Sequence, residues 1–245
     1  MNQLILKDVC KKYPNQPNYA LDHINLTVGK GEFVAVMGRS GSGKTTLLNV
    51  TSIIDKIDSG SIYCADREIS AFSDNEATNF RKNDIGFVFQ DYMLLDSLTI
   101  RENISVALSL KNVDSSKIDD LINSYAKRFN LYEQLKKYPY QLSGGQKQRV
   151  SIIRAIIKEP EIIFADEPTG ALDLKSSEGT MRILSEINKT EKVTILMVTH
   201  DVLSASYADR VVLLKDGKLN MEIDKEDCGE SFYDVITQAL SDRGE

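Results

Sequence analysis

The stretch from Gly38 to Thr46 reads GRSGSGKTT, and its residue types suit it to holding a phosphate chain. Gly38, Gly43, Lys44 and Thr45 match the phosphate-loop pattern G-x-x-x-x-G-K-[ST], a match expected by accident about 1% of the time in a chain of this length. Glycines let backbone N–H groups point inward, and a following helix N-terminus adds a positive dipole end. Lys44 would reach the β and γ phosphates, and the Thr45 hydroxyl would bind Mg²⁺. The alternative is a glycine-rich turn without a ligand.

Two adjacent carboxylates, Asp166 and Glu167, follow the apolar run IIFA at residues 162–165. Such a run is typical of a buried strand in a parallel sheet, and ligands of these sheets gather at the carboxyl ends of the strands. One carboxylate can hold Mg²⁺ while the other polarises a water molecule. We assign Asp166 to the metal and Glu167 to the base, because the alternative of a salt-bridged strand end accounts poorly for the pair.

Two more polar side chains end apolar β runs. Gln90 follows residues 85–89, where it would meet Mg²⁺ or the attacking water unless it is an ordinary loop glutamine. His200 follows residues 193–199, and this position favours contact with a γ phosphate. The other histidine, His23, precedes a predicted strand, and we interpret it as an exposed residue without a role.

A second glycine motif, LSGGQ, occupies residues 142–146 and precedes a helical pattern. Ser143, Gly144 and Gly145 at a helix N-terminus would form another anion-binding nest. A helix cap alone would require only the serine, and the phosphate loop already supplies one nest. The motif therefore indicates a second phosphate site whose ligand these residues do not identify.

The elements around these motifs predict an α/β fold with a parallel sheet. Short β patterns over residues 4–36 and 60–63 predict an antiparallel sheet beside this core. Residues 91–160 are predominantly helical in pattern and predict an inserted helical subdomain. Asp216-Gly217 predicts a closing hairpin, and an amphipathic helix is predicted near the C-terminus.

Two segments keep alternative interpretations. Tyr13 lies in a break between β patterns, where its ring would either stack on a purine or be half-buried in a turn. Residues 92–95, YMLL, would either dock a partner helix or be buried in the core, and burial is the commoner explanation.

Composition excludes several function classes. The chain has 30 Lys+Arg against 36 Asp+Glu and no basic run, which argues against non-specific binding of nucleic acid. The three cysteines and two histidines lack metal-binding spacing, so we expect neither a disulfide framework nor a zinc site. No apolar run approaches the roughly 18 residues of a membrane span, and the N-terminus lacks a signal-peptide core, so a membrane role would come through a partner.

With GRSGSGKT, Gln90, LSGGQ, FADE, the ALD of residues 171–173 and His200 in this order, the sequence resembles the nucleotide-binding subunit of ATP-binding-cassette (ABC) transporters. The likeness runs from Leu4 to about Leu219. It implies a P-loop NTPase (RecA-like) core with an N-terminal antiparallel β subdomain and an inserted helical subdomain. The expected ATP-binding domain is residues 1–222, with its helical subdomain at about 91–160, and residues 223–245 form a short helical extension.

The resemblance also implies a division of roles between two cassettes that face head to tail. Each ATP would lie between the phosphate loop of one cassette and the LSGGQ of the other, which would explain the second nest. Tyr13 would stack on adenine, Asp173 would cross the interface, and His200 would hold the γ phosphate.

The expected catalytic residues are Glu167, His200, Gln90 and Lys44, and the expected Mg²⁺ ligands are Thr45, Gln90 and Asp166. The residues expected to bind the nucleotide are Tyr13, Gly38, Arg39, Ser40, Gly41, Ser42, Gly43, Lys44, Thr45, Thr46, Gln90, Ser143, Gly144, Gly145, Gln146, Asp166, Asp173 and His200.

A narrower likeness lies in FADEPTGALD, MVTHD and GFVFQDYMLLDSLT. These segments resemble the cassette group that includes lipoprotein-release and macrolide-export systems, and most closely the Bce-type transporters that protect Gram-positive bacteria from peptide antibiotics. The expected protein is a homodimeric ATPase at the cytoplasmic face of the cell membrane. It would drive a separate permease and through it contact a sensor histidine kinase, without binding nucleic acid.

Other functions compatible with the resemblance are an ATP-gated signalling or mechanical module on a membrane complex, and export of the lipoprotein or macrolide type. A soluble cassette acting on ribosomes or DNA usually has two cassettes in one chain or long coiled-coil arms. This sequence shows neither feature.

Overall fold

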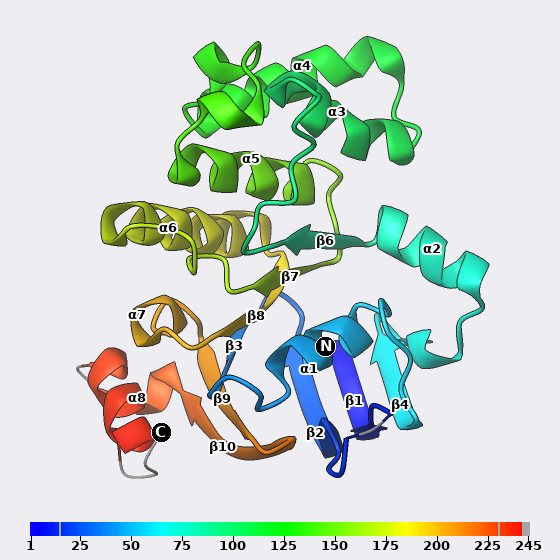
Figure 1. Cartoon of the computed structure of the whole chain (residues 1–245), viewed down its shortest axis with the longest axis vertical. Coiled ribbons are helices and arrows are strands. Elements are labelled where there is room, and N and C mark those ends of the chain that lie inside the picture. Colours follow the sequence, from blue (N-terminus) through cyan, green and yellow to red (C-terminus); the bar gives the residue numbers. More distant parts are fainter. Residues whose placement is uncertain (15, 230, 242–245) are drawn as a thin grey trace.

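The computed structural model describes residues 1–14, 16–229 and 231–241 and contains two sheets (Figure 1). The smaller, antiparallel sheet has the order β2-β1-β4-β5, and the larger has the order β10-β9-β3-β8-β7-β6. The smaller sheet consists of β1 (Asn2–Lys11), β2 (Leu21–Gly29), β4 (Ser59–Cys64) and β5 (Arg67–Glu68). The larger consists of β3 (Phe33–Met37), β6 (Ile85–Val88), β7 (Ile162–Asp166), β8 (Thr194–Thr199), β9 (Arg210–Lys215) and β10 (Lys218–Asp224). Neighbouring strands of the larger sheet pair in parallel from β9 to β6, and β10 pairs antiparallel with β9, so the predicted fold class is confirmed.

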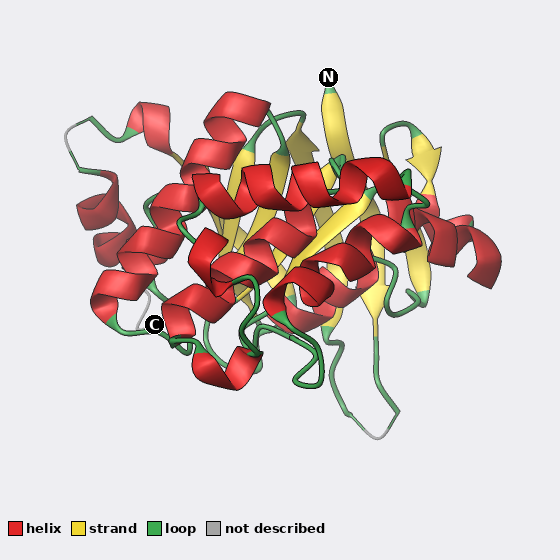
Figure 2. Cartoon of the chain, turned by 90° about the horizontal axis from the view of Figure 1, so that it is seen from above, coloured by secondary structure: helices red, strands yellow, loops and turns green. Residues whose placement is uncertain are grey.

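The helices join the strands and gather mainly on one side of the larger sheet (Figures 1 and 2). They are α1 (Lys44–Thr51), α2 (Asp74–Asn83), α3 (Ile100–Leu110), α4 (Ser115–Arg128), α5 (Gly144–Ile156), α6 (Leu174–Glu191), α7 (Val202–Ala205) and α8 (Phe232–Ser241). Helices α3, α4 and α5 lie within the segment predicted to be helical. Across the described part of the chain, no helix combines the length and apolar character needed to cross a membrane.

The larger sheet separates two apolar cores, as β3 shows. Phe33, Ala35 and Met37 pack among residues of α3, α5 and α6, whereas Val34 and Val36 pack with α1 and the smaller sheet. Successive strand residues point to opposite faces, so a continuous apolar run fits a strand that is covered on both sides. The phosphate-loop strand is therefore fixed from two directions.

Among the described α-helices, three begin with a reciprocal capping box. Ser73 and Glu76 form it at α2, Thr99 and Glu102 at α3, and Ser143 and Gln146 at α5. In each box the serine or threonine hydroxyl accepts from one backbone N–H while the acid or amide accepts from another, which satisfies donors that a helix start leaves free. Helix α2 was missed in the sequence analysis, although its box is present in the sequence.

The predicted hairpin and C-terminal helix are present, and the interpretation of His23 is only partly right, because its side chain is exposed as expected but its place in the fold differs. Strands β9 and β10 form the hairpin that turns at Asp216-Gly217, and α8 buries Phe232 and Ile236 against the core. His23 does not precede a strand. It lies within β2 with a φ of 54° and forms an ion pair with Asp8.

Candidate active site

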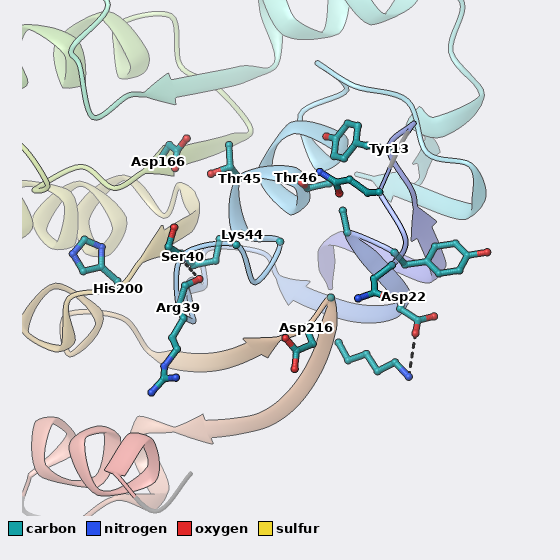
Figure 3. Close-up of a pocket in the computed structure, with 18 of the residues that line it drawn as sticks. Tyr13, Asp22, Arg39, Ser40, Lys44, Thr45, Thr46, Asp166, His200 and Asp216 are labelled. Atoms are coloured by element: carbon teal, nitrogen blue, oxygen red, sulfur yellow. Dashed lines mark hydrogen bonds and ion pairs between the residues drawn. The ribbon is translucent and has the colours of Figure 1, made fainter. Parts of the chain in front are cut away.

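The phosphate loop connects β3 to α1, and Lys44 is the first residue of that helix. Its side chain is largely buried, and Nζ donates hydrogen bonds to the carbonyl oxygens of Gly38 at 2.6 Å and Arg39 at 3.0 Å. Burial lowers the pKa of Lys44, while the charges of Glu167 and Asp166 oppose this shift. The loop therefore holds its ammonium group within electrostatic reach of both carboxylates, and Figure 3 shows Lys44 and Asp166 among the residues that line the same pocket.

Two positions of the loop require glycine. Gly43 has a φ of 109°, and a Cβ there would lie 2.3 Å from the Ala20 carbonyl oxygen. At Gly38 a Cβ would lie 2.2 Å from the Leu214 carbonyl oxygen. The loop is thus pressed between the start of β2 and the end of β9, and a side chain at either glycine would displace it.

The parallel strands β7 and β8 bring Asp166, Glu167 and His200 together at their carboxyl ends. Glu167 has a φ of 44°, an uncommon conformation that often marks functional sites, and its N–H donates to the Val198 carbonyl at 3.0 Å. His200 holds the Glu167 carboxylate in two ways. Its Nδ1 lies 2.8 Å from Oε2, and its backbone N–H donates to the same oxygen at 3.3 Å. One carboxylate oxygen of Glu167 is therefore fixed by the neighbouring strand.

The carboxylate cluster suits a hard divalent cation. Burial and the adjacent charge of Glu167 raise the pKa of Asp166, and Lys44 only partly offsets them. Thr45, Gln90 and Asp166 line the same cleft and offer hydroxyl, amide and carboxylate oxygens, the donor types that Mg²⁺ prefers. A divalent cation would also relieve the repulsion between the two carboxylates.

These residues line one cleft with a volume of about 1330 Å³. The predicted residues that line it are Tyr13, Arg39, Ser40, Gly41, Gly43, Lys44, Thr45, Thr46, Gln90, Asp166, Glu167 and His200. The sequence analysis missed the lining residues Tyr19, Asp22, Asp216 and Lys218. Tyr19 follows Tyr13 closely in the sequence, but no spacing rule marks it as a binding residue. Pairing of distant strands brings Asp22, Asp216 and Lys218 to the cleft, and the sequence alone does not reveal that pairing.

Tyr13 lines the cleft and has the half-buried environment that was one of its two predicted interpretations. The side chain is half-buried, and its hydroxyl donates to Asp55 Oδ2 at 3.0 Å. Lys11 Nζ lies 5.1 Å from the ring centroid. The ring is thus positioned by polar contacts while it lines the cleft, and its stacking on a purine stays a prediction.

The LSGGQ motif and Asp173 lie elsewhere. Among the described residues that line the cleft, none comes from residues 143–146 or from Asp173. Ser143 caps α5, and Asp173 caps α6 by accepting from the Ser176 N–H at 3.0 Å. The hydrogen bonds from Ser176 lower the pKa of Asp173. The second nest therefore does not face the phosphate loop of its own chain.

Two side chains of α5, both missed in the sequence analysis, hold the loops around the cleft. Buried Gln148 donates from Nε2 to the Pro168 carbonyl at 2.7 Å and to the Phe89 carbonyl at 3.4 Å. Pro168 follows Glu167, and Phe89 precedes Gln90. One amide therefore links the segments that carry Glu167 and Gln90.

Arg154, which lies further along α5 than Gln148, holds the segment after Gln90 in place. Its guanidinium donates to the carbonyls of Tyr92, at 2.8 Å, and Met93. Both of these residues have positive φ. The prediction of burial for residues 92–95 is therefore only partly right. Leu94 packs on the core, whereas Met93 is 55% exposed and Leu95 is 48% exposed.

Comparison with known proteins identifies the family. The profile of the ABC transporter family matches residues 21–170. The bacitracin export ATP-binding protein BceA of Halalkalibacterium halodurans is 49% identical over 207 residues, covering 84% of this chain and 82% of that protein. The dimeric post-hydrolysis structure of the cassette MJ0796 bound to ADP and Pi is 38% identical, with a TM-score of 0.83 and coverage of 90% and 98%.

A second solved structure, cbiO1 from Clostridium perfringens, is part of the ABC transporter complex cbiONQ. It is 28% identical, with a TM-score of 0.85, and covers 98% of this chain and 96% of its own. The resemblance noted in the sequence is confirmed, including its narrower likeness to the Bce-type group. The chain belongs to the ABC transporter family, as an ATP-binding subunit that hydrolyses ATP in support of transport.

Proposed function

We propose that two copies of this chain bind two ATP molecules between them and power a membrane permease that removes peptide antibiotics. The observation that carries the proposal is the separation of two phosphate sites within one chain. The phosphate loop and the carboxylates share a cleft, whereas the Ser143 nest lies outside it. A second copy in a head-to-tail arrangement would bring its nest to this cleft, and the dimeric structure of the MJ0796 cassette supports assembly as a dimer.

In this proposal Glu167 orients and deprotonates the attacking water. His200 contacts only one of its oxygens, so the other can accept the proton. Lys44 and the backbone N–H groups of the loop would stabilise charge on the phosphates. Mg²⁺, held by Thr45, Gln90 and Asp166, would neutralise phosphate charge when bound. Tyr13 would stack on adenine, Arg39 to Thr46 would surround the phosphates, and His200 would contact the γ phosphate.

Glu167→Gln tests the base. The variant keeps the size of the side chain and a hydrogen-bonding oxygen but removes the proton acceptor, so turnover should fall roughly 10²-fold or more while ATP still binds. Glu161→Gln, at an exposed carboxylate before β7, serves as the control and should retain turnover. Near wild-type ATPase activity of Glu167→Gln would reject the assignment.

Ser143→Arg tests the shared site. A long cationic side chain at the α5 N-terminus would block the nest without entering the cleft of its own chain. We expect ATP binding by the monomer to persist and ATP-induced dimerisation of a Glu167→Gln background to disappear, as measured by size-exclusion chromatography with light scattering. A dimer of normal stability in the double variant would contradict the head-to-tail arrangement.

Met93 and Leu95 support docking of a permease at the segment after Gln90. They are exposed, and Arg154 holds the backbone that carries them. Leu95→Glu should reduce co-purification with the membrane partner while leaving ATP binding intact. Tyr233→Glu on α8, at a similarly exposed position, should leave co-purification unchanged. Equal recovery of the partner with both variants would argue against this docking surface.

The substrate class rests on the similarity to the bacitracin exporter subunit. Cells that lack the chain should become sensitive to bacitracin-like peptides, and Glu167→Gln should fail to restore resistance. Identifying the permease that co-purifies from membranes would test location at the cytoplasmic face and the sensor-kinase contact together. Unchanged peptide resistance with a normal permease complex would favour the signalling, lipoprotein or macrolide alternatives.

A further inference from the structure

Three potential metal ligands of different chemistry meet where β1 pairs with β2. Cys10, Asp22 and His23 offer a sulfur, a carboxylate oxygen and a ring nitrogen, and these atoms all lie within 4.8 Å of one another. The antiparallel pairing, in which Val9 is opposite Ile24 and Lys11 is opposite Leu21, brings them together. Sequence spacing did not reveal the group because its members are close only across the sheet.

Asp8 orients the imidazole of His23. Its Oδ1 lies 2.6 Å from His23 Nδ1, while His23 Nε2 lies 3.8 Å from Asp22 Oδ1. A carboxylate on one ring nitrogen, which leaves the other for a cation, is the arrangement that usually supports histidine ligands of zinc.

The Cys10 sulfur also contacts His23. Cys10 is only 4% exposed, and its Sγ accepts a hydrogen bond from the backbone N–H of His23 at 3.3 Å. Cysteine sulfur is one of the ligands that zinc prefers in proteins. Because Cys10 is buried while the His23 side chain is 66% exposed, a cation would reach the sulfur from the solvent side of the imidazole.

We propose that Cys10, Asp22 and His23 bind a Zn²⁺ ion, with water as the fourth ligand. Mixed sulfur, nitrogen and oxygen donors suit zinc, whereas Mg²⁺ takes oxygen donors. Zinc bonds of about 2.0–2.3 Å place tetrahedral ligand atoms roughly 3.3–3.8 Å apart. The ligand atoms now lie within 4.8 Å of one another, so binding would draw them together by roughly 1 Å.

The surrounding charges also suit a divalent cation. The carboxylates of Asp8 and Asp22 flank the group, together with Lys218, whose Nζ lies 3.0 Å from Asp22 Oδ2. The other oxygen, Oδ1, is the one that faces His23, so the Lys218 pair and the metal would occupy different oxygens. The bound ion would join β1 to β2 at the base of the segment that carries Tyr13.

The experiment titrates Zn²⁺ into the purified, chelator-treated, nucleotide-free chain by isothermal calorimetry. Wild type should bind one ion per chain, and Co²⁺ should give a thiolate-to-cobalt charge-transfer band. Cys10→Ser and His23→Gln should each weaken zinc binding about tenfold or more, and Asp8→Asn about 10- to 100-fold through the imidazole. Cys228→Ser, at another free cysteine, should bind as wild type does.

Thermal unfolding separates loss of the site from loss of the fold. His23 is exposed, so His23→Gln should melt as wild type does without zinc and should lose only the zinc-dependent rise in midpoint. No stoichiometric binding by wild type would overturn the proposal. Wild-type affinity in both Cys10→Ser and His23→Gln would do the same, because zinc would then bind elsewhere. Neither result depends on ATP hydrolysis, so the proposed transport function is tested separately.

Discussion

Gln148→Leu gives a sharp test of how α5 positions the catalytic loops. The substitution removes the Nε2 donor from the Pro168 carbonyl at 2.7 Å and from the Phe89 carbonyl at 3.4 Å. A buried acceptor left without its donor costs about 1–3 kcal/mol, and the shorter bond should contribute most of it. Gln148 Oε1 has no partner among the described residues, so its removal offsets part of the cost. We therefore expect a net loss toward the lower end of this range, about 1–2 kcal/mol.

The protein should remain folded after this loss, because the free energy of unfolding of a native protein is about 5–15 kcal/mol. Turnover should nevertheless fall about tenfold or more, since a displacement of about 1 Å at the reacting groups can cost 10²-fold. KM for ATP should change little, because Lys44 and the loop glycines are untouched. Urea unfolding and steady-state ATPase assays on the same preparation measure both effects.

Ser151→Ala is the matched control, because it changes another buried polar side chain of α5. Ser151 Oγ also has no partner among the described residues, so its removal should leave stability unchanged or slightly higher and turnover normal. The positioning argument fails if Gln148→Leu lowers stability as expected but hydrolyses ATP at the wild-type rate. It also fails if Ser151→Ala loses turnover to the same extent.

Three further predictions concern stability and thiol reactivity. Arg210→Met should lower the free energy of unfolding in urea by about 3–5 kcal/mol, because the largely buried Arg210 side chain contacts Glu32, Glu222 and the Thr27 carbonyl. The control Arg182→Met, at an exposed ion pair, should lower it by under about 1 kcal/mol. Equal losses in the two variants would contradict the reasoning. At pH 8, iodoacetamide should label Cys228 in the folded protein, as read by mass spectrometry. Cys64 should react only after unfolding, because burial shields it and raises its pKa to about 11, and folded-state labelling would refute this. Thr99→Ala should cost about 1 kcal/mol in thermal unfolding, because α3 loses its cap, and an unchanged midpoint would show that the capping box contributes nothing.

The chemistry of the cleft could be predicted from sequence because it is encoded locally. Lys44 and Thr45 stand at fixed spacing from the loop glycines, and Asp166 and His200 end continuous apolar runs. The carboxyl ends of parallel strands then bring these residues to one edge without further information. The α/β class followed from the same runs.

Contacts between distant segments could not be predicted in this way. Gln148 and Arg154 lie on a helix whose pattern indicates only which face is apolar, and their acceptors are carbonyls that have no sequence signature. The grouping of Cys10 with His23 depends on the register of β1 with β2. Helix α2 was overlooked although its capping box is local, because its surface is mostly polar and gives a weak periodic signal.

The two-sided packing of β3 restricts how this protein can vary in length. Removing one residue from Phe33–Met37 would turn every later side chain of the strand to the opposite face of the sheet. Side chains that now pack in one apolar core would then point into the other. It would also move Gly38 away from the Leu214 carbonyl, where only glycine fits. Insertions and deletions among relatives should therefore accumulate in exposed connections such as residues 16–19, while the strand that carries the phosphate loop keeps a constant length.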